Sequence, residues 1–162
     1  MALGLGLLAI PWLAADLGFS VDQIPLIDRV FITDAVRADP GRPTAFSAVH
    51  DGHHHGMDGV LLAWSALLLT RTLSGVDTTR RRATLGLYVA GLLVFGFANA
   101  CQDFWTEQVV KRGVVSWELP RFTKFSTEPK WIALLVITAL VYMVALRPSG
   151  ILARADDRVA KG

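Results

Sequence analysis

The feature that most constrains this chain is a run of 20 residues without a charged side chain, from Ala83 to Gln102. A helix of that length is about 30 Å long, which matches the hydrocarbon thickness of a lipid bilayer. Arginines stand directly before the run, and Asp103 follows it. The run therefore predicts a membrane-spanning helix with charged ends.

The overall composition fits the same class of protein. Of the 162 residues, 52% are hydrophobic and 19% are charged, whereas soluble domains carry about 25% charged residues. The apolar residues occur in blocks with the charges between them, which disfavours a soluble enzyme, a nucleic-acid-binding protein and a disordered chain. The net charge of +2 is too small for a phosphate-binding stripe, and the single Cys101 excludes an internal disulfide.

Four apolar segments together predict an all-α integral membrane protein, with residues 1–162 as a single transmembrane domain. The expected spans cover about 1–19, 54–73, 83–107 and 130–147. The tight loop between the second and third spans holds Arg80, Arg81 and Arg82, and the C-terminal tail is also basic. The other side of the membrane would carry nearly as many basic residues, and the short length of the arginine loop favours a cytoplasmic position for both termini. We expect the plasma membrane of a bacterium.

Two polar connections are expected at the membrane surface, the segment 20–50 and the loop 111–130. Within the first, Ile24, Ile27 and Phe31 are spaced as on one face of a helix, with charged residues between them. This spacing predicts a short amphipathic surface helix that ends before Asp39. The loop 111–130 mixes basic and aromatic side chains, which is typical of the lipid headgroup zone.

All four histidines lie in one short stretch directly before the second span. On a helix with about 100° per residue, an arc of about 140° collects five side chains able to bind a metal. They are His50, Asp51, His54, His55 and Asp58. His53 points elsewhere, and glycines occupy the opposite side, which predicts a ligand face and a close-packing face. A glycine-rich loop over residues 50–56 is the alternative, since each glycine weakens a helix by about 1 kcal/mol.

A second polar group ends the third span. Asn99, Asp103 and Glu107 are four residues apart, so they share one face of a helix. A short loop makes the second and third spans antiparallel, which places this stripe level with the histidines, on the extracytoplasmic side. The alternatives are a helix end that emerges into water, with Glu107 paired to Lys111, and a hydrogen bond between helices for Asn99.

Neutral imidazoles and carboxylates together suit Zn, Cu, Fe or Mn. We therefore expect a divalent transition metal, with candidate ligands His50, His54, Asp58, His55 and Asp51. Asp103 and Glu107 are further ligands or catalytic acid–base groups. A catalytic metal would activate water or oxygen for reaction with a lipid-soluble substrate.

Whether the protein is an enzyme stays open from the residues alone. A non-catalytic accessory subunit of a larger membrane complex is the alternative function. At the histidines, the alternatives are a solvated glycine-rich segment and imidazoles that titrate beside carboxylates without a metal. The expected partners are the lipid bilayer and other membrane subunits or further copies of the chain, with no nucleic acid.

Overall fold

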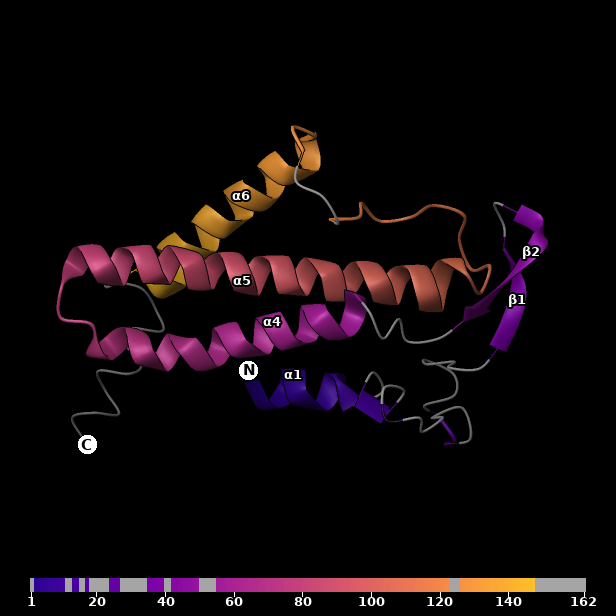
Figure 1. The fold of residues 1–162 in the computed structure, drawn as a ribbon, viewed down its shortest axis with the longest axis horizontal. Coiled ribbons are helices and arrows are strands. Elements are labelled where there is room, and N and C mark those ends of the chain that lie inside the picture. Colours follow the sequence, from indigo (N-terminus) through magenta and orange to yellow (C-terminus); the bar gives the residue numbers. More distant parts are fainter. Residues whose placement is uncertain are drawn as a thin grey trace. The chain divides into compact units, whose positions relative to one another are not determined.

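The structure is a computed structural model that describes residues 2–10, 13–14, 17, 24–26, 35–39, 42–49, 55–122 and 126–147. Helices account for most of these residues (Figure 1). The chain divides into two compact units. The first unit holds Ala2, Leu61–Phe97 and the chain from Phe122 onward, and the second holds Leu3–Val60 and Ala98–Arg121.

Helix α1 (Ala2–Leu8) lies in the first predicted span. Helical hydrogen bonding continues beyond it, because the Leu13 N–H donates to the Ala9 carbonyl at 3.0 Å and the Leu17 N–H donates to the Leu13 carbonyl at 3.1 Å. Helical hydrogen bonds are therefore present at Leu13 and Leu17, both within the predicted segment that ends near residue 19.

Strands β1 (Ala35–Asp39) and β2 (Arg42–Val49) form an antiparallel pair. Ala35 lies opposite Val49, and Asp39 lies opposite Arg42. This hairpin departs from the expectation that all regular structure in the chain would be helical.

The predicted amphipathic surface helix is wrong where the structure describes it. Residues 24–26 form a turn, in which Leu26 has a φ of 76°, outside the right-handed helical region. Pro25 explains the difference, because it lacks an N–H and disfavours the helical conformation at Ile24. Ile27 and Phe31 lie outside the described residues.

Two long helical segments form the centre of the chain. The first is α4 (His55–Leu69), which continues as the 3₁₀ segment η1 (Thr70–Gly75). The second is α5 (Thr79–Trp105), which continues as the π-helical segment η2 (Thr106–Val110). The arginine triplet expected in the loop lies instead in the first turn of α5, since arginine is a good helix former and extends the helix by four residues beyond the predicted start at Ala83.

Helices α4 and α5 run side by side in opposite directions (Figure 1). In the first unit, Ala66 of α4 shares a buried apolar cluster with Val89 of α5. In the second unit, Met57 and Val60 of α4 share another cluster with Ala100 of α5. The predicted antiparallel pairing is confirmed, and the start of α4 lies level with the end of α5.

Helix α6 (Pro129–Val141) continues as the π-helical segment η3 (Tyr142–Leu146) and matches the predicted segment 130–147. Pro129 stands in the first turn, where its missing N–H costs nothing. The helix packs closely on α5 at Gly86, where a Cβ atom would lie 3.1 Å from Cε2 of Tyr142. Any larger residue at this position would force the Tyr142 ring to shift by a few tenths of an ångström.

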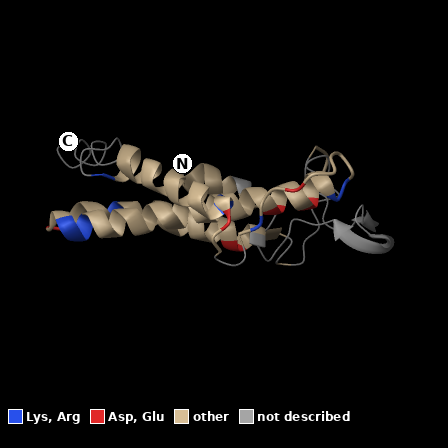
Figure 2. Cartoon of the chain, turned by 90° about the horizontal axis from the view of Figure 1, so that it is seen from above, with Lys and Arg blue, Asp and Glu red and all other residues tan. Residues whose placement is uncertain are grey.

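Two helical segments are long and apolar enough to cross a membrane, Thr79–Val110 with 32 residues and Pro129–Leu146 with 18. Figure 2 shows that the middle of α5 and of α6 carries no charge. In the most apolar 18-residue stretch of each segment, only 28% and 22%, respectively, is buried, so most of these side chains face outward. A core helix of a soluble protein shows the opposite distribution. Helix α4, with 15 residues, is shorter than both.

Candidate functional site

The end of α5 and the following segment η2 bury polar side chains in the second unit. None of them is more than 8% exposed. They are Asn99, Gln102, Asp103, Thr106, Glu107 and Gln108, and we call this group the buried polar face. Burial of a polar group without a partner costs several kcal/mol, so such groups need hydrogen bonds or ion pairs.

Each member of the buried polar face has an interaction partner. The Gln102 Nε2 donates a hydrogen bond to Thr106 Oγ1 at 2.8 Å. The Lys111 Nζ donates to both carboxylate oxygens of Glu107, each at 2.8 Å. The other three members also take part in interactions. Each of the buried polar side chains therefore has at least one interaction, as burial requires.

One alternative from the sequence was a helix end in water with Glu107 paired to Lys111, and the structure shows the ion pair but not the exposed helix end. The side chains are 10% and 25% exposed, respectively. The pair therefore does not stand at a helix end that emerges into water. Its charges lie in a less polar surrounding, where their attraction is stronger than at a surface.

A π-helical turn forms the end of this segment. The Lys111 N–H donates to the Thr106 carbonyl five residues earlier, at 3.0 Å. Such turns insert one extra residue into a helix and often occur at functional sites. Gly113 then ends the helix with a φ of 75°, and its N–H donates to the Val110 carbonyl at 2.8 Å.

The loop after the helix is held against α5 by an aromatic pair. The Trp105 Nε1 donates to the Trp117 carbonyl at 3.0 Å, and the two ring centroids are 4.3 Å apart. This contact returns the chain toward the last turn of α5 and fixes the position of the loop beside the buried polar face.

The predicted metal ligands on the histidine stretch are only partly described. His55 is the first residue of α4. Three of the five predicted ligands lie outside the described residues: His50, Asp51 and His54. Asp58 is exposed in the first turn of α4, whereas Gly56 and Gly59 are buried. The burial of these two glycines agrees with the predicted close-packing face.

The two predicted acid–base residues, Asp103 and Glu107, both belong to the buried polar face. Across the part of the chain that the structure describes, no three His, Cys, Asp or Glu side chains lie close enough together to hold a metal ion. Asp58 is exposed and does not join the two buried carboxylates in such a group. The metal set stays a prediction that depends on histidines outside the described residues.

The sequence argument missed Gln102 and Gln108 as members of the buried polar face. A signal for the first was present, because Asn99, Gln102, Asp103 and Thr106 stand at positions i, i+3, i+4 and i+7. That spacing is the pattern of a buried helix face, here filled with polar instead of apolar residues. The predicted stripe of Asn99, Asp103 and Glu107 therefore covers only part of the buried polar face.

No protein family model, no curated protein and no solved structure matches this chain.

Proposed function

We propose that this chain is an integral membrane protein that binds a divalent transition metal between the start of α4 and the end of α5. The observation that carries the proposal is the buried polar face. It lies in the unit that also contains the start of α4, whose first residue, His55, is the last of the four histidines. A charged group within hydrocarbon costs about 2.5–3.5 kcal/mol. Lys111 already supplies a cation for Glu107, and the proposed metal would supply a further one beside Asp103.

Four membrane spans are part of the proposal. Segments Thr79–Val110 and Pro129–Leu146 have the length and composition of spans. Helix α4 with η1 runs from His55 to Gly75, and rises of about 1.5 and 2.0 Å per residue give it a length of about 34 Å, enough to cross the hydrocarbon. The helical bonding from α1 to Leu17 supports the remaining span.

The metal would be held by imidazoles that precede α4, together with Asp103 of α5. Met57 and Val60 pack with Ala100, which brings the start of α4 level with this carboxylate. We place this face on the extracytoplasmic side, because the arginines of α5 lie at its other end. A metal-activated water or oxygen there would meet substrates that dissolve in the lipid.

A non-catalytic subunit of a larger membrane complex is the second candidate function. The specific observation in its favour is that both carboxylate oxygens of Glu107 already bind Lys111. A carboxylate engaged in this way stabilises the helix end without a metal. The outward apolar side chains of α6 would then contact other membrane subunits as well as lipid.

Metal content separates the two candidate functions. The full chain is purified in mild detergent after growth with Zn, Cu, Fe and Mn, and the metal per chain is measured by mass spectrometry. Three variants are compared: His54→Ala, Asp103→Asn and, as a matched control that removes a histidine off the predicted ligand face, His53→Ala.

The proposal predicts one metal per wild-type chain and per His53→Ala chain. The other two variants should bind it at least about tenfold more weakly, since even groups that only orient a ligand contribute that much. A folded wild-type chain without metal, or equal loss in all three variants, contradicts a metal site at these residues. The first of these results favours the subunit.

A further inference from the structure

The connection between α4 and α5 forms a pocket at the opposite end of α5 from the buried polar face. It has a volume of about 860 Å³, and all its lining residues belong to the first unit. They come from one continuous stretch, the end of η1 and the first turns of α5: Gly75, Val76, Asp77, Thr78, Arg80, Arg81, Thr84 and Leu85.

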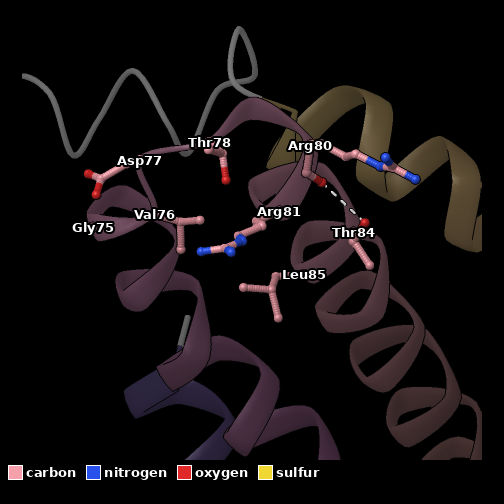
Figure 3. A pocket seen from close by; sticks show the side chains of 8 residues that line it. All are labelled: Gly75, Val76, Asp77, Thr78, Arg80, Arg81, Thr84 and Leu85. Atoms are coloured by element: carbon pink, nitrogen blue, oxygen red, sulfur yellow. Dashed lines mark hydrogen bonds between the residues drawn. The ribbon is translucent and has the colours of Figure 1, made fainter.

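The polar side of the pocket is cationic. Figure 3 shows the Arg81 guanidinium extending between Val76 and Leu85, whereas the carboxylate of Asp77 and the guanidinium of Arg80 both point away from it. Among the described residues, no ion pair involves Arg80 or Arg81. The first turn of α5 also contains no acidic residue. The Arg81 charge therefore lacks a protein counter-ion within the described chain. A guanidinium group can bind two phosphate oxygens at once.

The other side of the pocket is apolar and continues along the helix. Leu85 lines the pocket and is 43% exposed. Tyr88 lies one turn further on the same face of α5 and is 60% exposed. A ligand that places a negative headgroup at Arg81 would therefore find an exposed apolar surface for its chains directly beside it. Inorganic phosphate would use only the first half of this arrangement.

We propose that this pocket binds the phosphate headgroup of an anionic membrane lipid, with an acyl chain along Leu85 and Tyr88. The proposal rests on the membrane location that belongs to the proposed function, and it does not depend on the metal. Basic pockets at the membrane surface bind lipid headgroups in this way, and each arginine near the surface contributes about a fivefold gain in affinity.

The test measures how lipids stabilise the full chain in neutral detergent. The midpoint of thermal unfolding is followed while phosphatidylglycerol, phosphatidylcholine or inorganic phosphate is added. Arg81→Gln and the double variant Arg80→Gln, Arg81→Gln are compared with Arg121→Gln, which removes an exposed arginine of the second unit. Helical content by circular dichroism confirms that each variant is folded.

Phosphatidylglycerol should raise the midpoint, and the other two additives should not. The concentration for half of this effect should rise about fivefold in Arg81→Gln and about 25-fold in the double variant, with no change in Arg121→Gln. Equal effects of both lipids, an equal response of Arg81→Gln and Arg121→Gln, or the same shift with phosphate alone would overturn the lipid site.

Failure of this inference is distinguishable from failure of the proposed function. A chain that floats with liposomes but shows no lipid preference loses only the headgroup site. A chain that does not enter liposomes at all loses the membrane location, and the headgroup site with it. The metal content of Arg81→Gln should equal that of the wild type in either case.

Discussion

The two parts of α5 bury opposite kinds of side chains. Between Thr79 and Phe97, the helix buries small apolar residues such as Val89 and Ala90 and exposes large ones such as Leu87 and Tyr88. From Ala98 onward it buries amides and carboxylates. The first part therefore has its apolar side chains on the outside, which hydrocarbon would solvate, and the second has polar side chains on the inside, which only specific partners can satisfy.

This difference shows that an uncharged sequence does not indicate which kind of side chain a helix buries. The uncharged run from Ala83 to Gln102 crosses the boundary between the two units within α5. The part beyond Ala98 depends on a network of hydrogen bonds and ion pairs, and the part before it depends on close packing at glycine and alanine. Each dependence makes a separate prediction.

The largest effect is expected at the buried ion pair. Lys111→Met should reduce the free energy of unfolding by about 3 kcal/mol, because it leaves the Glu107 carboxylate buried without its cation. Adding Glu107→Gln should restore at least half of that loss, because no buried charge then remains. Denaturant titration in detergent measures both changes.

The matched control for this pair is the exposed ion pair of Arg121 and Glu118, whose side chains are 58% and 45% exposed. Arg121→Gln should change the stability by less than about 0.5 kcal/mol. A loss for Lys111→Met as small as that of Arg121→Gln would show that the second part of α5 is not sensitive to its polar network.

The next effect is expected where α5 and α6 approach closely. Gly86→Ala should destabilise the protein by about 1–2 kcal/mol, because the new Cβ would lie 3.1 Å from the Tyr142 ring and 3.6 Å from the Leu146 carbonyl. Gly91→Ala is the matched control, since its Cβ would meet only Cγ2 of Thr138, at 3.9 Å.

The Gly91→Ala variant should be neutral or more stable by up to about 1 kcal/mol, because alanine favours the helix. Thermal unfolding of both variants in the same detergent gives the comparison. If the two substitutions have the same effect, close packing at Gly86 is not what joins α5 to α6.

A smaller effect is expected at Thr138, on the buried side of α6. Its Oγ1 atom is buried and has no hydrogen-bond partner among the described residues. Thr138→Val replaces this hydroxyl with a methyl group of similar size, and should be neutral or stabilising by up to about 1 kcal/mol. A clear loss of stability in the same unfolding assay would mean that the hydroxyl has a polar role.

The smallest effect concerns pH at the start of α6. The hydrogen bond from Lys130 lowers the pKa of Glu128 below its ordinary value of 4.5. A lowered pKa in the folded state stabilises the protein fully above pH 4.5 and loses that contribution as the pH falls through the folded pKa. Glu128→Gln should therefore flatten the stability curve in this acidic range and leave its shape at neutral pH unchanged.

The sequence predicted the helical segments of residues 55–147 and the antiparallel pairing of α4 with α5, because uncharged length and a short connection are local properties. The sequence did not predict the turn at Pro25, because the spacing of Ile24, Ile27 and Phe31 indicates a helix that the proline disfavours. The hairpin was not predicted either. The sequence also missed the pocket at Arg81, because a cavity depends on how two segments fold back on each other.

The site was predicted only in part, because spacing along a helix is a local property and burial is not. The stripe of Asn99, Asp103 and Glu107 follows from helical spacing, and the structure buries all three. Whether Glu107 would face Lys111, water or a metal depends on burial, which spacing alone does not determine. Gln102 and Gln108 do not lie at the four-residue spacing of this stripe, so the spacing alone does not include them.

The most direct measurement places one spin label on the outward face of α6, at Val136, in a chain whose Cys101 is replaced by serine. Val136 is 53% exposed, so a label there should disturb the fold little. In lipid bilayers we predict frequent collisions of the label with dissolved oxygen and few with a water-soluble nickel chelate. Frequent collisions with the nickel chelate would place this face in water and contradict the membrane-spanning helix.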